Sequence, residues 1–70
     1  MKIKIILTNG NVIELGPIKY LEKEEKELIR EQIITILNND GKFIHFSRDT
    51  FNEDLLINKQ LIESVKIDGE

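Results

Sequence analysis

Two apolar segments near the end of the chain, residues 55–58 and 62–67, constrain its fold more than any other feature. Their leucine-rich and β-branched compositions favour strands, and the short Lys-Gln-Leu spacer between them has the length of one helical turn. Strands joined in this way typically close a small, strongly curved β-sheet or barrel. No catalytic or ligand motif lies beside them, so the pattern predicts an architecture and leaves the function open.

The start of the chain predicts a β-hairpin over residues 2–15. Apolar residues alternate with lysines in its first half, and a second strand-like segment follows an Asn-Gly pair. A two-residue turn at that pair would place Glu14 on the apolar face. A three-residue loop at 9–11, with its last asparagine in the left-handed conformation, instead pairs Leu7 with Ile13, and we expect this register.

Helical periodicity predicts one amphipathic helix over residues 22–38. Acidic residues crowd its first turns, where the helix dipole favours them, and Gly16-Pro17 separates it from the hairpin. The Asn-Asn-Asp-Gly run at 38–41 ends it. The apolar stripe consists of Leu28, Ile29, Ile33, Ile36 and Leu37.

The rest of the chain predicts three more strands, at residues 42–47, 54–58 and 63–67, with a polar loop between the first two. The order is therefore ββαβββ. We expect an α+β fold in which a curved, mainly antiparallel sheet or partial barrel packs on one helix; one sheet and a closed barrel both remain open.

The length of the chain, 70 residues, fits a single domain over residues 1–70. A core of this size rarely contributes more than about 3–5 kcal/mol of net stability. The sequence has no cysteine, which excludes disulfides and thiolate zinc sites. Because hydrophobic residues make up 40% of the chain, enough for a core and an interface, we expect a homo-oligomer.

The net charge of the chain is −3, from 10 basic and 13 acidic residues. A nucleic-acid-binding protein normally has a basic face that neutralises several phosphates, so we do not expect nucleic acid as the main partner. No segment has the roughly 18 to 20 uninterrupted apolar residues that cross a bilayer. The charged start leads through a short apolar run into a turn, as a strand does, so we expect a cytoplasmic protein without a membrane partner.

The densest polar group in the chain lies at residues 48–52. It combines a guanidinium suited to carboxylate or phosphate with a hydroxyl, an amide and an aromatic ring. The segment is either a ligand loop or a turn in which Asp49 and Thr50 bond the local backbone while Phe51 packs onto the core, and we favour the turn. The candidate residues for binding a small anionic ligand are Lys42, His45, Arg48, Thr50, Phe51 and Lys59.

The only histidine, His45, is the first candidate for acid–base chemistry. A general base needs an orienting partner and a nucleophile or bound substrate, and the sequence near His45 offers neither, so we place it on the less buried face of its strand. The carboxylate pairs 24–25 and 53–54 lack the histidine, glycine loop or acidic ladder of a metal site. We expect no enzymatic activity, no metal and no cofactor.

The acidic side of the helix is a candidate surface for a protein partner. Ile34 lies about 60° beyond Leu37 around the helix. It is either a single exposed isoleucine or, with Leu37, an extension of the stripe into a subunit contact. The candidate protein-contact residues are Glu24, Glu27, Glu31, Ile34 and Leu37.

The succession of strand, loop, strand, short turn and strand from Gly41 to Ile67 resembles the closing half of SH3-like and Sm-like small barrels. That resemblance implies, as an alternative function, a nucleic-acid-binding or regulatory module. Sm-like proteins place their helix before the first strand, whereas a hairpin precedes the helix here.

The composition of the chain, rich in Ile, Lys, Asn and Glu, resembles small accessory proteins of phages and prophages of Gram-positive bacteria, as does Leu56-Ile57-Asn58 before the strand Ser64-Val65-Lys66-Ile67. The resemblance implies a stoichiometric anti-defence inhibitor in the host cytoplasm. Its target would be a host protein, met by the acidic helix or a strand edge, or a small anionic ligand such as a nucleotide, held by Arg48 and lysines at a subunit interface.

Overall fold

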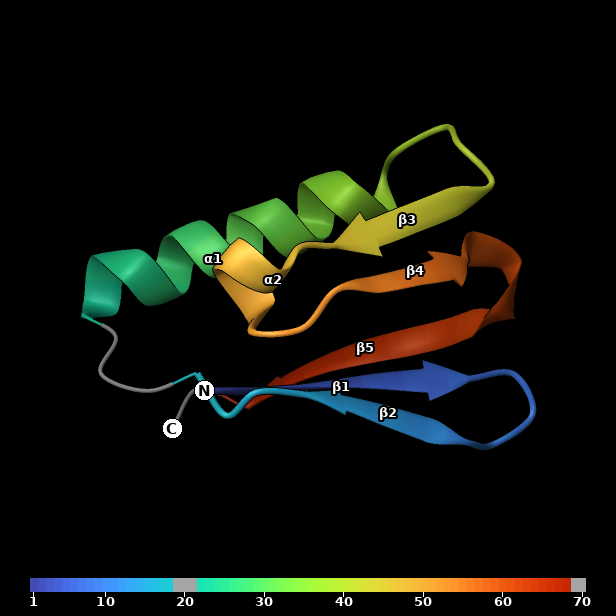
Figure 1. The fold of residues 1–70 in the computed structure, drawn as a ribbon, viewed down its shortest axis with the longest axis horizontal. Coiled ribbons are helices and arrows are strands. Elements are labelled where there is room, and N and C mark those ends of the chain that lie inside the picture. Colours follow the sequence, from blue (N-terminus) through green and yellow to red (C-terminus); the bar gives the residue numbers. More distant parts are fainter. Residues whose placement is uncertain (19–21, 69–70) are drawn as a thin grey trace.

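The computed structural model describes residues 1–18 and 22–68 and confirms the α+β fold with the order ββαβββ (Figure 1). The main helix and the last three strands lie within a residue of the expected bounds, and the first two strands form the expected hairpin over residues 2–15 with a different loop. One short helix was not predicted. The elements are β1 (Lys2–Leu7), β2 (Val12–Leu15), α1 (Lys23–Leu37), β3 (Phe43–Phe46), α2 (Arg48–Phe51), β4 (Leu55–Asn58), the 3-10 turn η1 (Lys59–Leu61) and β5 (Ile62–Asp68).

Within residues 1–18 and 22–68, the strands form two antiparallel sheets and no closed barrel. One sheet has the order β2-β1-β5, and the other pairs β3 with β4. The turn η1 connects β4 to β5, as the tail pattern predicted, and the side chain of Asn58 caps it by accepting a hydrogen bond from the Gln60 N–H at 3.0 Å. In Figure 1, α1 and the β3–β4 pair lie above the three-stranded sheet, with β3 between α1 and β4.

The predicted register of the first hairpin is wrong by two residues. The Leu7 N–H donates a hydrogen bond across the loop to the carbonyl of Asn11 at 2.8 Å, and Ile5 pairs with Ile13. The loop has three residues, as expected, but it is Thr8-Asn9-Gly10, with Gly10 at φ 89° in place of the expected asparagine. A shift of two residues leaves every side chain on its own face, so the apolar face is preserved.

A β-bulge in β5 brings apolar residues with an irregular spacing in the sequence to the same face of the sheet. Ile6 pairs with Ser64 while Leu7 pairs with Ile62, so Glu63 is an extra residue on β5. Without it, Ile62 and Val65, three positions apart, would point to opposite faces. With the bulge, both pack against the core.

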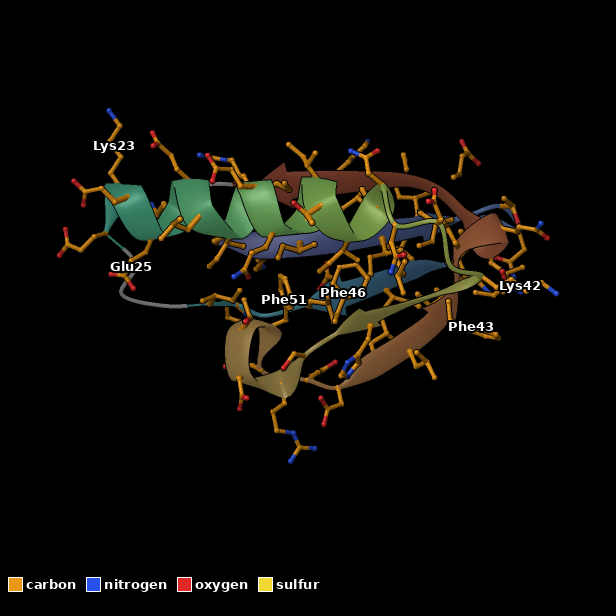
Figure 2. The ribbon with its side chains drawn as sticks, turned by 90° about the horizontal axis from the view of Figure 1, so that it is seen from above. Lys23, Glu25, Lys42, Phe43, Phe46 and Phe51 are labelled. Atoms are coloured by element: carbon orange, nitrogen blue, oxygen red, sulfur yellow. The ribbon has the colours of Figure 1, made fainter. Side chains whose placement is uncertain are left out.

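The core lies between α1 and the inner faces of the two sheets. Phe46 and Phe51 are its largest members, with ring centroids 5.2 Å apart and planes at 80°, and Figure 2 shows both between α1 and β3. Phe51 therefore packs onto the core, as the favoured turn interpretation predicted. The buried side chains are Met1, Ile3, Ile5, Leu15, Ile18, Ile29, Ile33, Ile44, Phe46, Phe51 and Ile57.

Local signals explain both ends of α1. Glu22 is the N-cap, and its backbone N–H donates to Oε1 of Glu25 at 3.2 Å, while Glu24 and Glu25 face the positive end of the helix dipole. Asn38 is the C-cap, with its N–H bonded to the carbonyl of Ile34 at 3.0 Å. Lys23 and Glu25 mark the start of the helix in Figure 2.

The segment predicted as a polar loop, residues 48–54, instead contains the helix α2. Ser47 caps it by accepting a hydrogen bond from the Asp49 N–H at 3.2 Å, and Asn52 ends it in the left-handed conformation at φ 66°. Four residues are too short for a periodic pattern, which is why the sequence indicated only polar turn chemistry here.

Candidate functional site

A groove runs along α1 on the side that faces β3 and α2. Three adjoining hollows form it: the first two share Leu28, Gln32 and Thr50, and the second and third share Thr35 and Ile36. The central hollow has a volume of about 400 Å³, within the range of ligand-binding cavities. We call this feature the α1–β3 groove; its lining is Ile18, Glu25, Leu28, Ile29, Glu31, Gln32, Thr35, Ile36, Asn38, Asn39, Asp40, His45, Ser47, Asp49, Thr50, Phe51 and Asn52.

The apolar stripe of α1 is wider than the part of it that the rest of the protein covers. Its uncovered edge forms one side of the groove. Ile29 and Ile33 are buried, but Leu28, which belongs to the same predicted apolar stripe, is 58% exposed at the lip of the groove. Leu28 is exposed because no element packs over this edge of α1 in the described structure. The floor is apolar, with Ile36 from the helix and Phe51 from α2.

The charged residues of the groove lining are all carboxylates. Glu25 and Asp49 line its first hollow, Glu31 the central one and Asp40 the third, and among the described lining residues there is no lysine or arginine. His45 is the one further titratable group. An apolar floor with an acidic rim attracts a cationic or basic segment and repels phosphate.

The candidate residues His45 and Arg48 do converge, but on Asp54. Nε2 of His45 lies 3.3 Å from Oδ1 of Asp54, the Arg48 N–H donates to the same oxygen at 2.9 Å, and Arg48 Nε lies 3.8 Å from Oδ2. The Arg48 N–H, and then the His45 hydrogen bond and the charges of both residues, hold the pKa of Asp54 below its usual value. Asp54 was considered in the sequence only as part of a carboxylate pair, and its role as the centre of this cluster was missed.

The lysines proposed for the same ligand lie at the opposite end of the β3–β4 pair. The Lys59 N–H donates to the carbonyl of Lys42 at 2.7 Å, and the Lys59 ammonium donates to the carbonyl of Asn39. Together they line a further hollow with Asp40, Gly41 and Gln60, which shares Asp40 with the third hollow of the groove. Because β3 lies between them and Arg48, one subunit does not gather these cations around one anion.

The two remaining ligand candidates lie in the groove. Thr50 is part of the lining shared by two hollows, and Phe51 is only 1% exposed, so its ring forms floor and core and is not free to stack on a base. In the central hollow, the sequence analysis did not identify the polar residues Gln32, Thr35 and Ser47. Only Gln32 and Thr35 carried a signal, since they follow Leu28 at spacings of four and seven residues on one side of the helix.

The candidate protein-contact residues divide among the rim of the groove, the outside of α1 and the core. Glu24, Glu27, Glu31 and Ile34 are exposed, and of these only Glu31 belongs to the groove. Leu37 is partly buried and packs against the core. Ile34 is 57% exposed, which leaves both interpretations of this residue open.

A second exposed apolar surface lies on the outer face of the β3–β4 pair. Ile44 and Phe46 point inward and are buried, so Phe43 and His45 point outward, and Leu56 lies opposite His45. Phe43 is 53% and Leu56 68% exposed. The strand alternation predicted the exposure of His45, but the apolar pair Phe43 and Leu56 was not recognised as a surface.

Residues 1–18 and 22–68 contain no group of three or more His, Cys, Asp or Glu side chains that could hold a metal ion. The helices among these residues are too short or too polar to span a membrane. No family model, no curated protein and no solved structure matches the chain.

Proposed function

We propose that this chain is a non-catalytic binding protein that acts by occupying a partner protein in a stoichiometric complex. The observation that carries the proposal is the lining of the α1–β3 groove, whose floor is apolar and whose charged rim, apart from His45, is acidic. A basic protein surface complements such a groove in both polarity and charge. The partner we propose is a host protein, and the setting a bacterial cytoplasm, in the manner of an anti-defence inhibitor of a phage or mobile element.

The placement of the basic residues supports a protein target over a nucleotide. Arg48 is engaged by Asp54, Lys42 and Lys59 lie at the other end of β3, and Phe51 is buried. A nucleotide site would need subunits to bring these groups together, and a nucleic-acid surface would need a continuous basic face.

A matched pair of charge reversals on α1 tests the proposal. Glu31→Lys and Glu27→Lys change the charge equally on the same helix, and both side chains are exposed, but only Glu31 lines the groove. We expect a tagged wild-type protein and Glu27→Lys to retain the same partner from bacterial lysate at a fixed ratio, and Glu31→Lys to lose it. Equal retention by both variants would contradict the groove as the binding surface.

A third variant separates protein binding from nucleotide sequestration. Arg48→Ala removes the guanidinium that an anion would need, while the groove lining stays intact. We expect native mass spectra of the wild type without retained small-molecule mass, and a protein complex unaffected by Arg48→Ala. A retained nucleotide-sized mass that disappears in Arg48→Ala would favour sequestration instead.

A further inference from the structure

The α1–β3 groove is bounded on one side by β3, which has a single strand neighbour among residues 1–18 and 22–68. β3 pairs there with β4, and in Figure 1 its other edge faces the end of α1 and the loop that follows it. His45 and Ser47, from β3 and the residue after it, line the central hollow. An unpaired strand edge beside an apolar groove is the arrangement in which extended peptides are bound by strand addition.

The hydrogen-bond pattern of the β3–β4 pair identifies which backbone groups are available at that edge. The Lys59 N–H bonds to Lys42 O, and the register continues through the pairs Ile44 with Ile57 and His45 with Leu56. Hydrogen-bonded and non-hydrogen-bonded pairs alternate in an antiparallel ladder. Lys42, Ile44 and Phe46 therefore direct their polar backbone groups toward β4, whereas Phe43 and His45 direct theirs away from it.

The other side of the groove supplies the contacts that would give specificity. Leu28 is 58% exposed at the lip, and the central hollow of about 400 Å³ has the apolar floor formed by Ile36 and Phe51. The carboxylates of Glu25, Glu31, Asp40 and Asp49 follow the groove from one end to the other. A partner segment with an apolar side chain in the hollow and Lys or Arg on either side of it would match both the apolar floor and the carboxylates.

We propose that the partner enters the α1–β3 groove as an extended basic segment that adds a strand to the free edge of β3, bonding the backbone of Phe43 and His45. Alternate side chains of the segment point into the groove, where an apolar one occupies the central hollow and Lys or Arg residues face the carboxylates. This inference rests on the proposed function, which it extends by naming the binding mode and the chemistry of the partner.

A random peptide library displayed on phage and selected on the purified protein provides the probe. We expect enriched peptides to combine Lys or Arg with apolar residues at alternate positions. When the best synthetic peptide is added to 15N-labelled wild-type protein, the amide protons of Phe43 and His45 should gain about tenfold protection from exchange, as two new backbone hydrogen bonds of about 0.5–1.5 kcal/mol each imply.

Two substitutions at one position test the strand edge directly. His45→Pro and His45→Ala both remove the imidazole, but only proline removes the edge N–H, at a position where the β3–β4 ladder does not use it. We expect His45→Pro to weaken peptide binding at least about tenfold relative to His45→Ala. The exchange measurement uses the wild type, so the inference stays testable even if His45→Pro fails to fold.

The remaining outcomes separate the binding mode from the function. Peptides that shift the resonances of Leu28 and Thr50 without protecting Phe43 and His45 would overturn strand addition and leave the groove as a protein-binding site. Enriched peptides that bind elsewhere would overturn both strand addition and the groove as the binding site. A selection that enriches no peptide would overturn the proposal that the partner binds as a linear segment. A protein that is dimeric alone, with both amides already protected, would show that a second copy occupies the edge.

Discussion

The carboxylate of Asp54 accepts a hydrogen bond from the backbone N–H of Arg48 at 2.9 Å and thereby joins the start of β4 to the first turn of α2. Nε2 of His45, on β3, lies 3.3 Å from the same oxygen. One side chain thus connects three consecutive elements, and two of them, β3 and α2, contribute His45 and Thr50 to the central hollow. The cluster is exposed, so its effect is to position α2 more than to stabilise the whole fold.

These contacts predict a pH dependence that depends on Asp54. Its pKa is lowered in the folded protein, chiefly by the Arg48 N–H, so the stabilisation is present above the unfolded pKa and is lost as the pH falls through the folded pKa. We expect Asp54→Asn to have a slightly lower Tm at neutral pH and a smaller loss of Tm on acidification. Thermal unfolding by circular dichroism at neutral and acidic pH measures both; Glu53→Gln is the control, and an unchanged acid profile in Asp54→Asn would contradict the prediction.

The three phenylalanines predict very different losses of stability for the same substitution. Phe46 and Phe51 are 0% and 1% exposed and contact each other, whereas Phe43 is 53% exposed. Replacing either buried ring by alanine should cost about 3–5 kcal/mol, as much as the whole net stability expected for a domain this small. We expect Phe46→Ala and Phe51→Ala to be largely unfolded in urea titrations, and Phe43→Ala to stay within about 1 kcal/mol of the wild type.

The periodicity of the sequence was sufficient for the element order but not for the register of the first hairpin. Registers that differ by two residues place the same side chains on the core face, so alternation cannot distinguish the predicted Leu7–Ile13 pair from the observed Ile5–Ile13 pair. The loop determines the register, because Gly10 adopts φ 89° at low conformational cost. The sequence contained this glycine, but the neighbouring asparagine was an equally acceptable left-handed residue on local grounds.

The groove could not be predicted from the sequence, for a different reason. Its two sides, Leu28 on α1 and His45 on β3, meet only because α1 and β3 pack around the buried rings of Phe46 and Phe51. Helical spacing places Leu28 beside Ile29 but does not say which edge of the stripe another element covers. The placement of His45 on the exposed face, by contrast, follows from strand alternation alone and was predicted.

The hairpin loop provides a test that distinguishes the observed register from the predicted one. A Cβ on Gly10 would meet no atom within 4 Å, so the penalty for Gly10→Ala comes from the backbone alone. We expect a loss of about 1–2 kcal/mol in the free energy of unfolding. Asn11→Ala should change it by less than about 0.5 kcal/mol, because Asn11 is not left-handed here. The reverse order in urea titrations would support a loop at 9–11.

The outer face of the β3–β4 pair predicts where self-association, still an expectation for this chain, would occur. Phe43 and Leu56 are diagonal neighbours on that face, 53% and 68% exposed, whereas Ile34, among the described residues, has no other strongly exposed apolar residue beside it on its side of α1. Adjacent apolar side chains exclude water from a contact better than a single one. We therefore expect Leu56→Lys to shift native mass spectra toward the monomer, with little change in Tm because the side chain is exposed.

The matched substitution Ile34→Lys tests whether the effect of Leu56→Lys is specific to the outer face of the β3–β4 pair. It adds the same charge at a residue of similar exposure on α1, and we expect it to leave the subunit count of the wild type unchanged. A shift to monomer in Ile34→Lys alone would assign the contact to the helix and support the extended stripe through Leu37. A wild type that is monomeric at every concentration would show that the homo-oligomer prediction is wrong, and that the stability of this small core is sufficient without a second subunit.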